Sequence, residues 1–200
     1  MSEAYSKHQL VMMAVGTAIN SWNQVESGMG ILFLAVSDIA NPYKAGAIFD
    51  RMVSFETRLA VLDAAMEFEA LISEDEKLIW TNLSARLRKN YKKRHEVAHF
   101  TTGTPEDMAE GAGIFPYFTW NKHHTSNTKL LTQPQILERS LKFSALSNCV
   151  TWFSRTAAHR KQPAKFPPPS SEEPPLIAHI RELELLKKQE SERQRPPTPG

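Results

Sequence analysis

Cysteine is almost missing from this chain. Cys149 is the single cysteine among 200 residues, which excludes an intrachain disulfide and a zinc site built from several thiolates. The sequence also lacks an apolar run long enough to span a membrane, and the short apolar run at 10–19 continues into a helical pattern rather than a signal-peptide cleavage site. We therefore expect a cytoplasmic protein that does not bind a membrane.

The chain carries no large net charge, but one of its segments contains no acidic residue. The formal net charge is +2, too small to indicate a polyanionic partner by itself. No acidic residue occurs from Lys77 to His95, and five cations there form what we call the basic strip: Arg86, Arg88, Lys89, Lys92 and Lys93. Such a strip suits a polyanion better than a neutral peptide, and the alternative is an ordinary solvated helix face.

Proline is scarce until residue 161 and frequent afterwards. Nine of the 13 prolines follow Lys161. We predict one domain over 1–160 and a Pro-rich, largely disordered tail over 161–200. Within the tail, five apolar residues at helical spacing indicate a short helix, either docked or transient: Leu176, Ile177, Ile180, Leu183 and Leu186.

The first 160 residues show the 3.6-residue period of amphipathic helices. We predict an all-α fold, an antiparallel bundle of about four main helices. The first helix covers 11–36, and the others begin at the capping signals Asn41-Pro42, Ser73–Glu76 and Thr132–Gln135, with a break near Val53-Ser54 in the second helical region.

The helical period disappears after the third main helix, between Thr101 and Leu131. Glycines and prolines surround an aromatic run at 114–120, which predicts a short β-hairpin with 128–132. The alternative is a loop that packs its own aromatic side chains. Either insertion directly follows the third helix and could shape a site there.

The sequence Arg-His-Glu-Val-Ala-His at Arg94–His99 matches two catalytic patterns. From His95 it is the His-Glu-x-x-His of zinc hydrolases, with both imidazoles on one helix face. However, the extended zinc pattern requires Gly at position 102 and His at 105, where this chain has Thr102 and Pro105. The preceding cations also disfavour a dication. We expect no metal and no other cofactor.

From Arg94, the same letters resemble the motif of HEPN ribonucleases, in which an arginine, a polar residue and three further residues precede a histidine. The resemblance covers most of 5–160, including Trp22–Glu26 in the first helix and Trp80 in the third. It implies RNA as the substrate, a homodimer with the motifs facing across a cleft, and a toxin or defence role with a nucleotidyltransferase-like antitoxin. A noncatalytic HEPN-like module that binds RNA, nucleotide or protein is the alternative.

The resemblance implies Arg94 and His99 as the catalytic pair. Metal-independent RNA cleavage uses the 2′-hydroxyl of the RNA as nucleophile, so the protein must transfer protons and stabilise the negative charge at phosphorus. Proton transfer suits His99, and binding of the charged phosphate suits Arg94. We expect His95, Glu96 and Glu26 in supporting roles. On one helix Arg94 and His99 point about 140° apart, which favours a site completed by a second copy.

Overall fold

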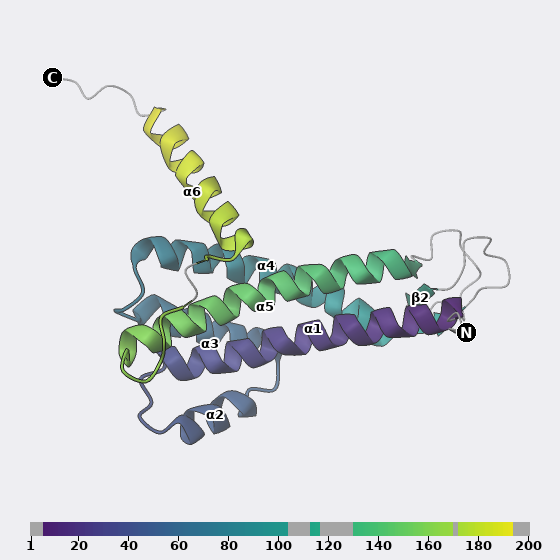
Figure 1. The fold of residues 1–200 in the computed structure, drawn as a ribbon, viewed down its shortest axis with the longest axis horizontal. Helices are drawn as coiled ribbons and strands as arrows, with labels where there is room; N and C mark the ends of the chain where they lie inside the picture. Colours follow the sequence, from purple (N-terminus) through teal and green to yellow (C-terminus); the bar gives the residue numbers. More distant parts are fainter. Residues whose placement is uncertain (1–5, 104–112, 117–129, 170–171, 194–200) are drawn as a thin grey trace. The chain divides into compact units, whose positions relative to one another are not determined.

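The computed structural model describes residues 6–103, 113–116, 130–169 and 172–193. These residues form an all-α helical bundle with a small β-sheet, which confirms the predicted fold class (Figure 1). The helices are α1 (Lys7–Val36), α2 (Pro42–Arg51), α3 (Phe55–Phe68), α4 (Glu74–His99), α5 (Gln133–Lys161) and α6 (Pro175–Arg193). Of the described helices, none combines the length and apolar character needed to cross a membrane.

The helix starts follow the predicted capping signals. The Asn41 side chain accepts hydrogen bonds from the backbone N–H groups of Tyr43 and Lys44, at 2.9 and 3.2 Å, before the proline that opens α2. Ser54 caps α3 in the same way, because its Oγ accepts from the Thr57 N–H at 3.0 Å. The break near 53–54 is therefore confirmed, and it divides the second helical region into α2 and α3.

The insertion after α4 contains the predicted hairpin in part. β2 (Gly113–Pro116) pairs antiparallel with β3 (Leu131–Thr132), and Ile114 lies opposite Leu131. A third strand that we did not predict, β1 (Phe100–Gly103), pairs with the other edge of β2. A Cβ on Gly113 would lie 2.7 Å from the Leu131 carbonyl oxygen, so only glycine fits there. Residues 104–112 and 117–129 lie outside the described part of the chain.

The chain divides into two compact units. The first contains 1–28 and 87–147, and the second contains 29–86 and 148–200. Helices α1, α4 and α5 each contribute a segment to both units. The division into a domain over 1–160 and a tail stays a prediction, although the tail's short helix is present as α6, where Ile177 and Ile180 are buried.

The core of the first unit is built around Trp22 of α1, which is fully buried. Its ring meets Phe143 of α5 edge-on at 5.1 Å between centroids, and it lies 6.0 Å from the ring of Tyr91 on α4. Behind the ring, the hydroxyls of Ser21 and Ser140 are 3.0 Å apart, so each buried hydroxyl has a partner. Trp22 thus fixes the packing of the three helices that surround the motif.

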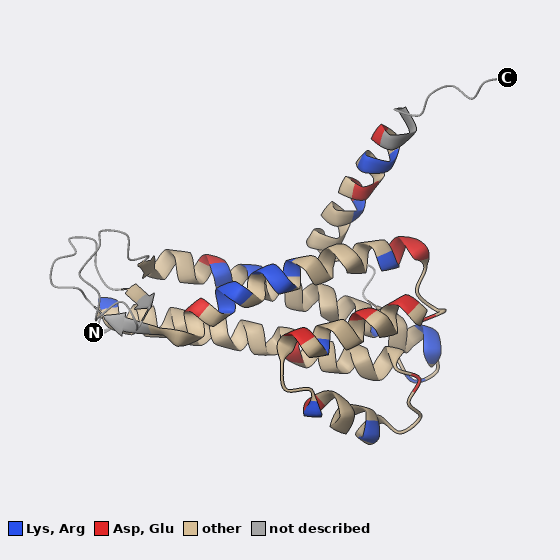
Figure 2. Cartoon of the chain, turned by 180° about the vertical axis from the view of Figure 1, so that it is seen from behind, with Lys and Arg blue, Asp and Glu red and all other residues tan. Residues whose placement is uncertain are grey.

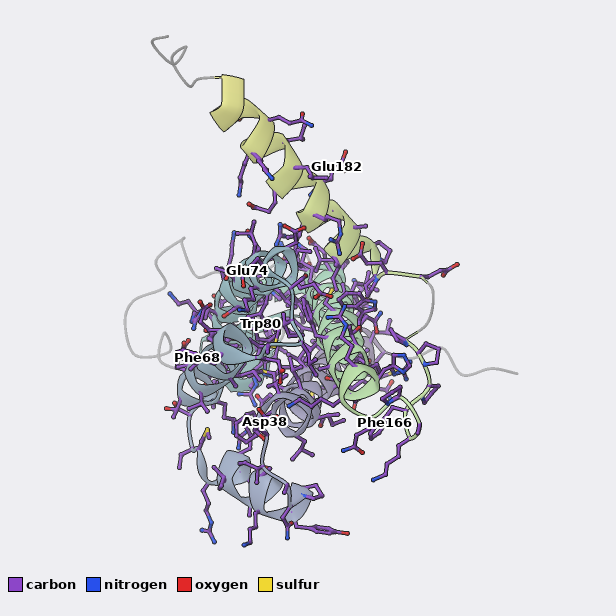
Figure 3. All side chains as sticks on the ribbon, turned by 90° about the vertical axis from the view of Figure 1, so that its left-hand side faces the viewer. Asp38, Phe68, Glu74, Trp80, Phe166 and Glu182 are labelled. Carbon is purple, nitrogen blue, oxygen red and sulfur yellow. The ribbon has the colours of Figure 1, made fainter. Side chains whose placement is uncertain are left out.

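The core of the second unit contains Trp80 of α4, which lies among the helices in Figure 3. Its Nε1 donates to Asp63 on α3 at 2.9 Å, and Ser84 donates to the other oxygen of the same carboxylate at 3.0 Å. The ring packs edge-on against Phe153 of α5, with 5.5 Å between centroids. A buried indole with a satisfied N–H is typical of a core tryptophan.

Candidate active site

The motif occupies the end of α4. No glycine or proline interrupts this helix from Glu74 to His99, so α4 continues through the whole motif before β1 begins at Phe100. The positive charge that His99 can carry also suits the negative end of the helix dipole. The helix therefore sets the directions of the motif side chains.

Arg94 projects from the inward side of α4. It follows Leu87 by seven residues and precedes Val97 by three, and both of these side chains are buried. Arg94 itself is half-buried, and its Nε is buried without a hydrogen-bond partner. A buried donor left unpaired costs about 1–3 kcal/mol. Because this nitrogen is closed to solvent, an acceptor such as a phosphate oxygen reaches it only when the Arg94 side chain moves.

The two histidines lie on a different face of the helix. His95 and His99 are both exposed, and their rings contact each other with 4.1 Å between centroids and a tilt of 44°. His99 points about 140° away from Arg94 around the helix axis. The structure thus brings the histidines together, whereas Arg94 and His99 of one copy do not share a face.

Glu96 is held in an ion pair with a residue that we did not predict. Arg139 of α5 contacts Glu96 Oε2 through Nη2 at 2.6 Å and donates through Nη1 to the Lys93 carbonyl at 3.0 Å. The Arg139 side chain is only 10% exposed. Arg139 lies between Ile136 and Phe143 on the buried stripe of α5, and a charge at such an inward position was the signal that could have identified it.

Glu26 is bonded to a core residue of its own helix, α1. Its Oε1 accepts a hydrogen bond from Trp22 Nε1 at 2.7 Å, and the Trp22 ring lies opposite Tyr91. The Glu26 carboxylate therefore reaches back along α1 to the buried Trp22 ring, which packs against Tyr91 of α4. The supporting role of Glu26 stays a prediction.

The basic strip follows α4, as the blue segment of this helix in Figure 2 shows. Lys89 and Lys92 are exposed, whereas the three others are partly buried: Arg86, Arg88 and Lys93. Arg86 belongs to the second unit and the other four residues to the first. Lys89 and Lys92 are therefore the members of the strip most accessible to a polyanion.

Lys93 connects the strip to α5. Its pKa is lowered by burial and then by the charges of Lys142, Lys89 and Arg139, while Glu138 acts weakly in the opposite direction. All three of these cations therefore disfavour the charge on Lys93. We call Lys89, Lys93, Arg139 and Lys142 the α4/α5 cation cluster.

The residues around His95 and His99 fit a zinc site poorly. Within the described part of the chain, no three His, Cys, Asp or Glu side chains form a group that could hold a metal ion. A zinc hydrolase would use Glu96 as its general base, but this carboxylate is paired with Arg139. The histidine pair therefore has no third ligand among the described residues, and the next acidic and histidine residues along the chain lie in 104–112 and 117–129, outside the described part.

Comparison with known proteins assigns no family to the chain. No family model, no curated protein and no solved structure matches it. The resemblance to HEPN ribonucleases therefore depends on the motif at Arg94–His99 and on the helices around it.

Proposed function

We propose that this protein is a metal-independent endoribonuclease of HEPN type that acts as a homodimer, with a toxin or defence effector as its biological role. One observation carries the proposal. Arg94 presents a buried guanidinium Nε without an acceptor, in the last turns of a helix that also carries the exposed His95/His99 pair and the basic strip. This combination provides an anion-binding group, proton-transfer groups and a phosphate-binding track on one element.

The chemistry requires no group beyond these side chains. The 2′-oxygen of the RNA attacks the adjacent phosphorus, the bond to the 5′-oxygen breaks, and the products are a 2′,3′-cyclic phosphate and a free 5′-hydroxyl. His99 exchanges a proton with the reacting oxygens, since imidazole both accepts and donates protons near neutral pH. Arg94 stabilises the extra negative charge on the phosphorane through paired N–H donors.

The supporting residues have distinct expected roles. His95 contacts the His99 ring and can orient it. Glu96 fixes the end of α4 through Arg139, and Glu26 holds Trp22 in place on α1. The basic strip binds the RNA backbone without reading its sequence. As a toxin, the protein would be neutralised by a nucleotidyltransferase-like antitoxin.

Cleavage in the presence of EDTA tests the proposal. Wild-type protein should cut single-stranded RNA in the chelator and leave cyclic phosphate ends. Arg94→Ala and His99→Ala should each reduce the rate by a factor on the order of 100 or more, because each removes a group that acts in the transition state. Mass spectrometry of the products identifies the ends, and circular dichroism verifies that the variants are folded.

Matched substitutions on other helices provide the controls. Arg51→Ala on α2 and His179→Ala on α6 remove the same side-chain types from exposed positions and should leave the rate unchanged. Wild-type protein that binds RNA but never cuts it would contradict the enzyme and favour the noncatalytic HEPN-like module.

A further inference from the structure

A second helix lies beside the basic strip and adds cations to it. On α4, Lys89 and Lys93 are one turn apart, and on α5, Arg139 and Lys142 are also one turn apart. The hydrogen bond from Arg139 to the Lys93 carbonyl fixes these two helix segments side by side within the first unit. The α4/α5 cation cluster is therefore a surface formed by two helices, which the sequence alone did not indicate.

The carboxylates near this cluster only partly neutralise it. Glu96 is paired with Arg139, and Glu138 with Lys142. No described carboxylate forms an ion pair with Lys89 or Lys93, and Lys92 adds an exposed charge beside them. Mutual repulsion lowers the pKa of Lys93, after the effect of its burial. Excess positive charge kept at such close range is typical of surfaces that bind polyanions.

We propose that the α4/α5 cation cluster binds the phosphate backbone of single-stranded RNA, so that the substrate crosses from α4 onto α5 instead of following α4 alone. The inference rests on the proposed function for the identity of the polyanion. Lys89 and Lys142 are the residues expected to contact phosphates directly, since both project charge into solvent. Arg139 is a positioning residue, because its side chain is almost completely buried and already bonded.

Glu138 allows a substitution whose expected effect on RNA binding is opposite to that of removing a cation. Glu138 is exposed and contacts Lys142 one turn away on α5. Bound RNA would compete with Glu138 for Lys142. Glu138→Gln should therefore tighten RNA binding, whereas Lys142→Gln should weaken it.

Binding of an uncleavable RNA measures this surface without requiring catalysis. The probe is a uridine 20-mer with 2′-O-methyl groups, titrated by fluorescence anisotropy at several salt concentrations. Each lost phosphate contact lowers the slope of log K against log salt by about 0.7, which corresponds to about fivefold weaker binding at 0.1 M salt. We expect this change for Lys142→Gln and about twice this slope change for Lys89→Gln/Lys142→Gln.

Lys187→Gln is the matched control, because Lys187 is an exposed lysine on α6 that also pairs with a glutamate one turn away. It should leave both the affinity and the slope unchanged. An affinity for the probe that Lys142→Gln and Glu138→Gln do not alter would overturn the inference, while cleavage in EDTA could still succeed. Equal losses in the Lys187 control, or binding to vesicles of acidic phospholipid in place of the probe, would also overturn it. Failure of cleavage with the expected binding changes would instead reject only the ribonuclease.

Discussion

Glu76 shows how one residue can fix the start of the helix that carries the motif. It is buried, and it completes the predicted capping box, since Ser73 donates to Glu76 Oε2 from its backbone N–H and from its hydroxyl, both at 2.9 Å. Arg160 of α5 contacts both carboxylate oxygens, at 2.8 and 2.9 Å. Burial alone would raise the pKa of Glu76, but the hydrogen bonds from Arg160 and Ser73 outweigh it and lower the pKa.

This lowered pKa predicts a defined pH dependence of stability. A carboxyl group whose pKa is lower in the folded state stabilises the protein above its unfolded pKa, and this contribution disappears as the pH falls through the folded value. The free energy of unfolding should therefore decrease as the pH falls below about 4.5, the ordinary value for glutamate. Glu76→Gln should flatten this decrease, as measured by urea unfolding at a series of pH values.

Glu74→Gln is the control for the same turn, because the Glu74 side chain is 87% exposed. It should leave the pH dependence nearly unchanged. Arg160→Met should also destabilise the protein at pH 7, by roughly 1–2 kcal/mol after allowing for the partial exposure of Arg160. The same decrease in the free energy of unfolding at acidic pH in wild type and in Glu76→Gln would contradict this role of Glu76.

At the scale of elements, helix α6 packs against Cys149. The thiol is buried in the second unit, where the backbone of Ile177 lies against it. Burial is the main cause that raises the pKa of Cys149 to about 12. A thiol with this pKa is almost entirely protonated at neutral pH, so it is a poor nucleophile as long as α6 stays docked.

Thiol reactivity therefore reports the docking of α6. In native protein, Cys149 should react slowly with Ellman's reagent at pH 8. Ile177→Asp places a charge on the buried face of α6. It should increase the rate of the reaction with Ellman's reagent by a factor on the order of ten or more, because undocking of α6 exposes the thiol. Leu185→Asp, at a position that is 55% exposed, is the control and should react like wild type. Rapid labelling of the wild type would show that α6 does not protect this cysteine.

The sequence predicted where the helices begin more reliably than it predicted which segments contact one another. Asn41 and Ser73 cap helix starts within a few residues, so the sequence could place α2 and α4, whereas Ser54 was predicted only as part of a break and not as the cap of α3. The strand β1 was missed because Phe100–Gly103 is too short for an alternating pattern and directly follows a helix. Its pairing with β2 is a contact distant in sequence.

The candidate site could be predicted only in part for the same reason. The motif letters identified Arg94, His95 and His99, and helical geometry predicted that Arg94 and His99 diverge. The inward position of Arg139 on α5 was a readable signal, but its pairing with Glu96 depends on the register between α4 and α5, which no local pattern encodes.

At the scale of the whole molecule, the divergence of Arg94 and His99 predicts that a site is shared by two copies. Arg94→Ala and His99→Ala proteins should each be inactive alone. Mixed in equal amounts, they should recover about a quarter of the wild-type activity, since half of the dimers are mixed and each mixed dimer has one complete site. Cleavage assays after subunit exchange, with sedimentation analysis of the oligomeric state, measure this recovery.

The double variant Arg94→Ala/His99→Ala is the control for the mixing experiment. Combined with either single variant, it forms no complete site and should restore nothing. Full ribonuclease activity from strictly monomeric wild-type protein would contradict the shared site, even if the same residues act in catalysis.

The exposed His95/His99 pair has a practical consequence for purification. Two imidazoles one turn apart on an accessible helix face form a small chelate for Ni²⁺ or Cu²⁺, so the untagged protein should be retained on an immobilised-metal resin. Protein prepared on such a resin can carry leached metal on these side chains. Elemental analysis of that sample would then suggest a metalloenzyme for reasons unrelated to catalysis. Ion-exchange purification avoids this artefact.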